Sequence, residues 1–348
     1  MKQLEVAYIG LDLHASHSEF GVIDGRGREC QRHRLSTDPQ MMADWLDKIS
    51  ATHKFLAVEE GSLTQWISWQ LAGSVDELVV CDPKENFWIS RSAKKTDHID
   101  VVKLARLLRM GELRAVWHPA QKNDRALFAA AAAHYIAMRR EQVRLKHQIK
   151  SSFRRWGVLD VTGESVYSKQ GRKPYLEQIS DEVICEQLLS LYTLLDHTVG
   201  AQATAKQRLY RCGSGYEEIF EFQKMPGVGP VCAHLFSGIV QTPHRFETIQ
   251  KLWRWGKLGV TDCSSNGKPL GYQRLDPNGR SELKDISYRV WKAGAMQATT
   301  TNEVKRFYQK SLSNSSSQTN ARLNTQRKIL KVLWTLWRKQ VCYNPKVF

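Results

Sequence analysis

Short apolar runs alternate with amphipathic segments in the first third of the chain. The short apolar runs predict strands, and the segments with apolar residues at helical spacing predict helices. Residues 4–34 predict strands that flank a turn at residues 24–27. Further buried strands are predicted at 55–60 and 77–83, and helices at 38–50, 62–73 and 97–111. Strands followed by alternating helices and strands are typical of an RNase H-like α/β domain.

The pattern becomes helical from about residue 123. Residues 123–157 predict one long helix that ends at Gly157, and residues 179–211 predict a second. Two helices of this length indicate a coiled-coil-like or bundle middle domain. A mainly helical C-terminal part follows, with a polar, Gly-rich region at 259–280 and a Ser/Asn-rich linker or loop at 311–320. The expected domains are residues 1–117, 118–215 and 216–348.

Charge adds the first indication of function. The chain has 51 Lys and Arg residues against 35 Asp and Glu, a formal net charge of +16, which favours a polyanionic partner. Ten basic residues and no acid follow Glu303, and seven basic residues accompany Glu141 within 139–155. The alternative is that these runs are only solvated helix faces. We expect nucleic-acid contacts from Lys94, Lys95, Arg139, Arg140, Arg144, Lys146, Gly227, Gly229, Lys268, Arg274, Arg327 and Lys328.

Composition argues against several other classes of protein. Hydrophobic residues make up 42% of the chain, enough for a sizeable core, and no apolar run is long enough to cross a membrane. The N-terminus becomes polar too soon for a signal peptide. The seven cysteines are scattered without a CxxC pair, which predicts neither a zinc site nor a disulfide framework. A reducing cytoplasm fits this cysteine usage best.

Acidic residues end two of the predicted strands. Asp12 follows the apolar run YIGL, and Glu59 ends the run LAV, with Glu60 as the alternative at that strand. A carboxylate at the end of a buried strand needs a metal, an arginine or solvent. Asp12 could also be exposed if the strand frays at Gly10. The carboxyl ends of strands in an α/β sheet are where such proteins bind ligands.

A second pair of acids begins the helix predicted at 97–111. Asp97 and Asp100 are three positions apart, so both carboxylates share one helix face. Capping of the helix N-terminus is the alternative role for Asp97. Together with Asp12 and Glu59, they match the hard oxygen ligands that two Mg²⁺ ions need in phosphodiester chemistry.

Several segments resemble a known family. The runs IGLD, VEEGSLTQW, VVCDP and KKTDHIDVVKLA, and later CSSNGKP followed by RLD, resemble the DEDD transposases of bacterial insertion sequences. That family is guided by a bridge or seeker RNA encoded in the element. The resemblance is strongest over 6–117 and 216–290. It implies a RuvC-like N-terminal domain, in which Asp12, Glu59, Asp97 and Asp100 bind Mg²⁺, and a bacterial cytoplasmic location.

The same resemblance implies a serine nucleophile in the C-terminal domain. Counting back from Arg274 points to Ser265, and Ser264 is the alternative because Asn266 stands where the family's serine is often followed by glycine. Without the family, this segment is simply a turn. The run MPGVGP at 225–230 resembles a helix-hairpin-helix turn, whose glycines allow the backbone to approach a phosphate.

The expected function is RNA-guided, site-specific DNA recombination with Mg²⁺ and a serine nucleophile. The expected partners are donor and target DNA duplexes, the guide RNA and further copies of the chain, as a dimer or tetramer. One alternative is a RuvC or RNase H-type Mg²⁺ nuclease that acts on DNA junctions without a covalent step. The other is a non-catalytic nucleic-acid-binding protein. An actin-like sugar kinase is disfavoured by the charge and by the lack of phosphate loops.

Overall fold

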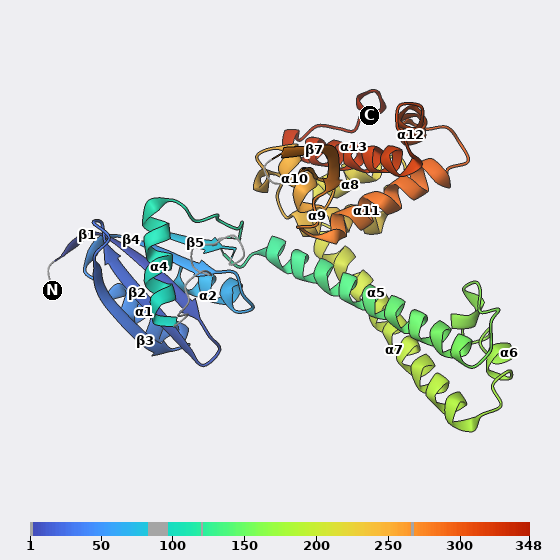
Figure 1. The fold of residues 1–348 in the computed structure, drawn as a ribbon, viewed down its shortest axis with the longest axis horizontal. Helices are drawn as coiled ribbons and strands as arrows, with labels where there is room; N and C mark the ends of the chain where they lie inside the picture. The colour runs from blue at the N-terminus through green and yellow to red at the C-terminus, as the bar shows by residue number, and fades with distance from the viewer. Residues whose placement is uncertain (1–2, 83–96, 120, 266–267) are drawn as a thin grey trace. The chain divides into compact units, whose positions relative to one another are not determined.

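The computed structural model describes residues 3–82, 97–119, 121–265 and 268–348, without the side chains of 97–100, 263–265, 268–270, 272 and 347 (Figure 1). The chain divides into two compact units, residues 1–123 and 124–348. In the described residues, no helix is long and apolar enough to cross a membrane.

A mixed sheet forms the centre of the first unit. Among the described residues it has five strands in the order β3-β2-β1-β4-β5, with β1 antiparallel to β2 and parallel to β4. This confirms the predicted RNase H-like sheet. The strands and helices are β1 (Leu4–Leu13), β2 (His17–Asp24), β3 (Glu29–Ser36), α1 (Pro39–Asp47), β4 (Ala51–Glu59), α2 (Thr64–Leu71), β5 (Glu77–Cys81) and α4 (Asp97–Met110).

Side chains of alternate strand residues build a separate core on each face of the sheet. Ile9 and Leu11 of β1 pack with Leu46 of α1 and Ile67 of α2 on one face. The opposite face is covered by α4, which crosses β1, β2 and β4 (Figure 1). The residues on this second face alternate along each strand with those of the first face, and one of them in β1 is Tyr8.

Two paired glycines let α4 lie directly on the sheet. Gly10 of β1 is opposite Gly21 of β2. A Cβ atom at Gly10 would lie 2.0 Å from the carbonyl oxygen of Val101, and one at Gly21 would lie 2.8 Å from the Val101 side chain. Because any larger residue would push the helix away, this pair determines where the start of α4 meets the sheet.

Two long helices begin the second unit and confirm the predictions for this region. Helix α5 (Asp124–Arg155) packs along α7 (Glu182–Gly213), and Gly157, at φ +85°, follows the end of α5. Between them lie a short 3-10 turn η1 (Ser165–Tyr167) and helix α6 (Lys173–Leu176). A small core that includes Phe153 and Tyr192 closes this end of the helix pair.

Helices also dominate the rest of this unit, around a second and larger core. The polar region 259–280 contains a β-hairpin that the sequence did not predict. The linker or loop predicted at 311–320 is shorter than expected, because only residues 314–317 connect α12 to α13. The elements are α8 (Glu217–Gln223), α9 (Pro230–Val240), η2 (Pro243–Arg245), α10 (Ile249–Trp255), β6 (Val260–Ser265), β7 (Lys268–Leu275), α11 (Ser281–Trp291), the π-helical turn η3 (Lys292–Met296), α12 (Glu303–Ser313), α13 (Gln318–Lys339) and η4 (Pro345–Val347). The three-part domain division stays a prediction.

Candidate metal site and nucleic-acid interface

Asp12 lies on the sheet face that α4 covers. It follows Gly10 by two residues in β1, and residues two apart in a strand point to the same face. About one third of the Asp12 side chain is exposed, and its carboxylate accepts a hydrogen bond from Nε2 of His14 at 3.2 Å. The strand does not fray at Gly10, because β1 continues to Leu13. Asp12 is therefore held by regular strand structure at the carboxyl end of β1.

Glu59 lies on the same face of the neighbouring strand. It follows Ala57, which packs with Leu104 of α4, by two residues. The parallel register pairs Leu11 with Val58, so Asp12 and Glu59, each one residue further on, are neighbours at adjacent strand ends. The two strand acids of the predicted site are thus brought together by backbone register.

Glu60 comes after the end of β4 and is exposed. Its backbone N–H donates to the carbonyl oxygen of Cys81 at 2.8 Å, and its Oε1 lies 3.9 Å from Nε2 of His118. The buried hydroxyl of Thr64 donates to the Glu59 carbonyl oxygen at 2.7 Å and so holds the chain where it leaves the strand. This geometry favours Glu59 over Glu60, although the choice stays a prediction.

The other two predicted acids lie at the start of α4. The helix begins at Asp97, and Asp100 immediately precedes Val101, whose carbonyl oxygen lies over Gly10. The backbone of Asp100 therefore runs close to β1 on the Asp12 face. The side chains of Asp97 and Asp100 lie outside the described residues, as do Lys94 and Lys95 entirely.

A further acid, Glu19, was missed by the sequence analysis. The antiparallel register of β1 and β2 places it directly opposite Asp12, and only 3% of its surface is exposed. Its Oε1 lies 3.9 Å from Nε of Arg34 on β3. The sequence did contain a signal for this arrangement. If a tight turn joins two antiparallel strands at 4–13 and 17–24, Glu19 lies opposite Asp12.

The chemistry of these acids matches that of a divalent metal site. Asp12, Glu59 and Glu19 supply hard carboxylate oxygens on one face of a rigid sheet, which is the chemistry that Mg²⁺ requires. Within the described side chains, no group of three or more His, Cys, Asp or Glu already lies close enough to hold a metal. The start of α4, with two more acids, reaches this same face.

The predicted serine lies in the β6–β7 hairpin. Ser265 is the last residue of β6 and pairs with Lys268, the first residue of β7, while Ser264 pairs with Pro269. Near the other end of the hairpin, Gln273 donates to Asp262 at 2.8 Å. The backbone thus presents both serines beside the connection between the strands. The side chains of Ser264, Ser265 and Lys268 lie outside the described residues.

Comparison with known families agrees with both halves of this description. A transposase model of the DEDD type matches residues 9–156, and a model described as transposase of the IS116/IS110/IS902 family matches residues 221–309. The chain belongs to the IS116/IS110/IS902 family of transposases. Membership implies DNA binding, DNA cleavage and transfer, and a divalent metal ion. A search of curated proteins found no match.

The glycine-rich turn of the transposase joins α8 to α9, as a helix-hairpin-helix turn would. Gly227 has φ +86°, and a Cβ atom there would lie 2.4 Å from the carbonyl oxygen of Val290 in α11. Its lack of a side chain therefore serves packing within the domain. Gly229 is different, because it caps the N-terminus of α9 and has open space around its Cα. Only Gly229 keeps the geometry expected for a close phosphate approach.

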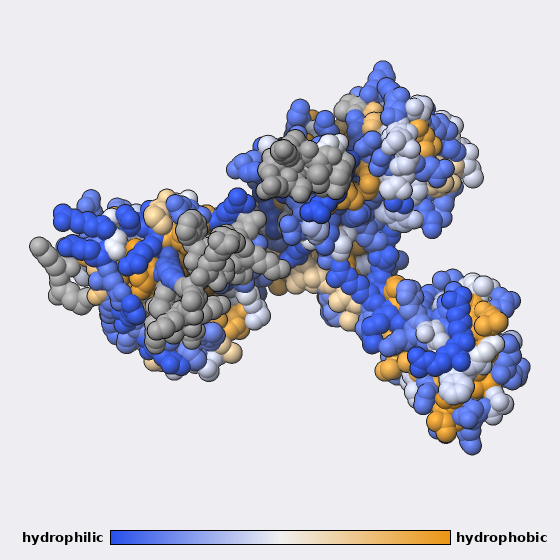
Figure 2. Space-filling view, viewed as in Figure 1, coloured by the Kyte–Doolittle hydropathy of each residue, from blue (hydrophilic) through white to orange (hydrophobic). Residues whose placement is uncertain are grey.

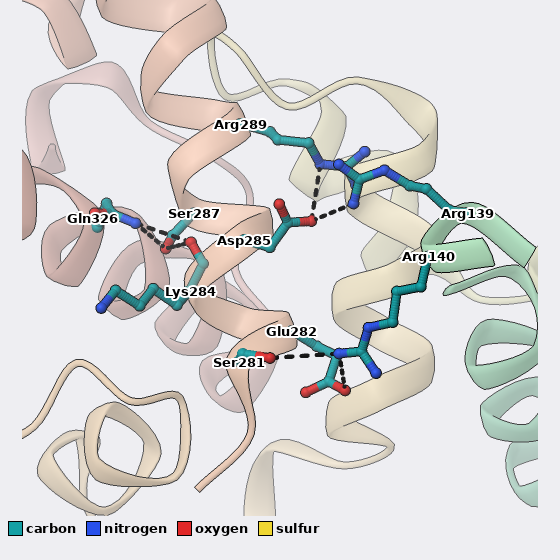
Figure 3. A network of polar contacts seen from close by, with 9 residues as sticks. All are labelled: Arg139, Arg140, Ser281, Glu282, Lys284, Asp285, Ser287, Arg289 and Gln326. Carbon is teal, nitrogen blue, oxygen red and sulfur yellow. Dashed lines mark hydrogen bonds and ion pairs between the residues drawn. The ribbon is translucent and has the colours of Figure 1, made fainter. Parts of the chain in front are cut away.

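Four of the predicted basic contacts are engaged inside the transposase. Arg139 of α5 donates to Asp285 of α11 at 2.7 Å, and Arg140 donates to Glu282 at 2.9 Å (Figure 3). Two further pairs are Arg144 with Glu141 and Lys146 with Glu164. The pairs of Arg139, Arg140 and Lys146 tie α5 to neighbouring segments, whereas the pair of Arg144 with Glu141 lies within α5 itself. A nucleic-acid role for the four cations remains a prediction and would require competition with these acids.

The remaining predicted cations differ in their surroundings. Arg327 donates through Nε to the carbonyl oxygen of Leu258 at 2.7 Å, and burial lowers the pKa of its guanidinium. Burial also lowers the pKa of Lys328, whose Nζ lies about 6 Å from two aromatic ring centres. Arg274 is exposed on β7 opposite Thr261. Figure 2 shows broad hydrophilic surface over the helices of this unit.

Proposed function

We propose that this transposase is an RNA-guided, Mg²⁺-dependent DNA recombinase in which Asp12, Glu59, Asp97 and Asp100 hold the metal. The observation that carries the proposal is the common sheet face of Asp12 and Glu59, which the start of α4 reaches at Gly10. Four carboxylates drawn from two strands and one helix would converge on that face. Two bound divalent ions would supply charge stabilisation for the attacking and departing oxygens of a phosphodiester.

The strand acids position the reacting phosphate in this proposal. Asp12 and Glu59 are fixed by regular β-structure, so their carboxylates need little reorganisation when a charged substrate arrives. His14, which donates to Asp12, holds one orientation of that carboxylate. Glu19 adds a negative charge beside Asp12 and so strengthens the attraction of the site for cations.

Ser265 is the proposed nucleophile, with Ser264 as the alternative. Its oxygen bonds to phosphorus as the hydroxyl proton leaves, and the bond from phosphorus to the departing deoxyribose oxygen breaks as that oxygen is protonated. The cleaved strand end stays covalently joined to the protein, so the energy of the broken phosphodiester bond is conserved for joining that end to a new DNA strand. Activation would come from a metal site of the same or a neighbouring subunit, in a dimer or tetramer.

A covalent adduct tests the nucleophile. The full-length protein, with its RNA, is incubated with Mg²⁺ and end-labelled DNA that carries an insertion-sequence end, and adducts are resolved on a denaturing gel. Ser265→Ala should abolish the adduct, whereas Ser264→Ala, a matched loss of one neighbouring hydroxyl, should retain it. The reverse result would move the nucleophile to Ser264.

The same assay separates the alternatives. Cleavage that needs Asp12 but survives both serine substitutions would support a junction nuclease without a covalent step. Cleavage or adduct formation that survives Asp12→Asn would contradict the proposed metal site. If the protein binds nucleic acid in this assay but breaks no strand, the result would support a non-catalytic binding protein.

RNA guidance is tested by purification from cells that carry the whole element, followed by sequencing of the RNA that remains bound. One discrete RNA from the flank of the element is the expected result. Replacement of the guide sequence within that RNA should redirect recombination to the DNA that matches the new sequence. Random cellular RNA, recovered at a salt concentration that preserves specific complexes, would contradict guidance and leave an unguided transposase.

A further inference from the structure

Four cationic side chains gather in the second unit, with no carboxylate partner among the described residues. Lys257 follows α10, Lys284 lies on α11, and Arg322 and Arg327 lie on α13. All four side chains are half-buried. In the part of the chain that the structure describes, none of them lies within ion-pair distance of an acidic group. This cluster is distinct from the paired arginines of α5.

Hydrogen bonds bring the four positions together. Gln326 donates through Nε2 to the carbonyl oxygen of Lys284 at 2.9 Å, which joins α13 to α11. Arg322 lies one helical turn before Gln326 on α13. Arg327 donates to the carbonyl oxygen of Leu258, the residue after Lys257. Figure 3 shows Lys284 beside Gln326, with its side chain extending away from Asp285.

The cluster carries an unbalanced positive charge. Burial lowers the pKa of Lys284, and the charges of Arg322, Lys257 and Arg327 lower it further. The buried Nε of Arg322 makes no hydrogen bond within the described residues. Removing cations from water without counter-charges costs free energy, and mutual repulsion adds to that cost. A polyanion would relieve both terms, which is the expected property of a preformed phosphate site.

The position of the cluster indicates which polyanion it serves. Lys257 is separated by only two residues from the start of β6, and the base of the hairpin is closed by the Asp276 N–H, which donates to the Gly259 carbonyl oxygen at 3.0 Å. A phosphate held by these cations therefore lies at the base of the hairpin that carries Ser264 and Ser265. For a transposase, the strand that must be held there is DNA.

We propose that Lys257, Lys284, Arg322 and Arg327 form a cradle for the phosphodiester backbone of DNA at the base of the β6–β7 hairpin. Its role is to hold the strand without reading its sequence, because all four groups are cationic donors that match phosphate oxygens. The inference rests on the proposed function for its choice of DNA. It does not depend on the metal site or on the identity of the serine.

The test measures DNA affinity as a function of salt. A fluorescent duplex of random sequence is titrated in EDTA with full-length wild type, with Lys257→Gln/Lys284→Gln, and with the control Lys48→Gln/Lys173→Gln. The control removes the same charge from two exposed lysines elsewhere. Each phosphate contact contributes roughly 0.9 to the slope of log affinity against log salt. The cradle variant should lose about 1–2 units of slope, while the control should match wild type.

Further arms separate charge from folding and DNA from RNA. Lys257→Arg/Lys284→Arg should restore the slope because it keeps both charges. Without nucleic acid, the Gln variant should unfold at the same temperature as wild type or higher, because repulsion is relieved. An unchanged slope, an equal loss in the control, or a loss confined to duplex RNA of the same sequence would overturn the proposal. Since EDTA is present, failure of the metal site would appear only in the adduct assay.

Discussion

Asp12 and Glu19 face each other across the antiparallel pair of β1 and β2, on the sheet face that α4 covers. Directly opposed residues in such a pair have Cβ atoms roughly 5 Å apart. The two carboxylates repel each other, and Arg34, whose Nε lies 3.9 Å from Oε1 of Glu19, offsets part of that repulsion. The burial of Glu19 makes this effect larger, since only 3% of its surface is exposed.

Glu19→Gln should therefore weaken Mg²⁺ binding. A divalent cation about 6 Å from one carboxylate gains roughly 1.4 kcal/mol even at the dielectric constant of water, so the affinity should fall by about tenfold or more. Isothermal titration with Mg²⁺ and with Mn²⁺ checks this directly. Glu29→Gln, an exposed acid on β3, is the matched control. Equal affinity for Glu19→Gln and wild type would show that Glu19 acts only in packing.

Gly10→Ala should displace the start of α4. The new Cβ would lie 2.0 Å from the Val101 carbonyl oxygen, which is backbone and cannot turn aside. Overpacking of this kind costs about 1–3 kcal/mol, measured by urea unfolding. Metal binding should weaken as well, because Asp97 and Asp100 move with the helix. Gly73→Ala, where no atom lies within 4 Å of the added methyl group, should change neither quantity.

Gly227→Ala and Gly229→Ala form a matched pair that separates packing from phosphate binding. Gly227→Ala should lower the free energy of unfolding by about 1–3 kcal/mol, because its methyl group meets the backbone of α11 and its φ is positive. Gly229→Ala should leave stability nearly unchanged. It should reduce DNA affinity if phosphate approaches the N-terminus of α9. Binding that is insensitive to Gly229→Ala would limit this turn to a structural role.

His234 should make the second unit sensitive to acid. It lies on α9, where Nδ1 donates to the Pro230 carbonyl oxygen at 2.7 Å, and burial lowers its pKa. The unfolded chain binds a proton near the ordinary pKa of 6.5, whereas the folded chain resists protonation. The contribution of neutral His234 to the free energy of unfolding is therefore fully present above about pH 6.5. It falls as the pH drops toward the lower pKa of the folded state, by up to about 1.4 kcal/mol per pH unit.

Urea unfolding at a series of pH values, followed by circular dichroism, measures this dependence. His234→Gln should flatten the profile below about pH 6.5. His244→Gln, at an exposed position on η2, removes one histidine from the surface instead and should keep the wild-type profile. A variant at His234 with the full wild-type slope would assign the acid sensitivity to other groups.

The elements of this protein follow from local pattern. The strands of the first unit, the helix that begins at Asp97 and the long helix that ends before Gly157 all lie where apolar periodicity and turn residues placed them. Local sequence governs such features because backbone geometry and side-chain period act over a few residues. Motif resemblance likewise identified the transposase family, because contiguous runs carry it.

Relationships between distant residues depended on packing instead. Local pattern did not reveal the β6–β7 hairpin, because its polar and Gly-rich composition lacks a strand period. The basic run of α5 gave no sign that Arg139 and Arg140 are paired with acids of α11. The register of β1 and β2 places Glu19 opposite Asp12, and the packing of helices brings Lys284 into the cationic cluster with Lys257. These arrangements join residues that are neighbours only after the chain has folded, and so their energies depend on the whole tertiary structure.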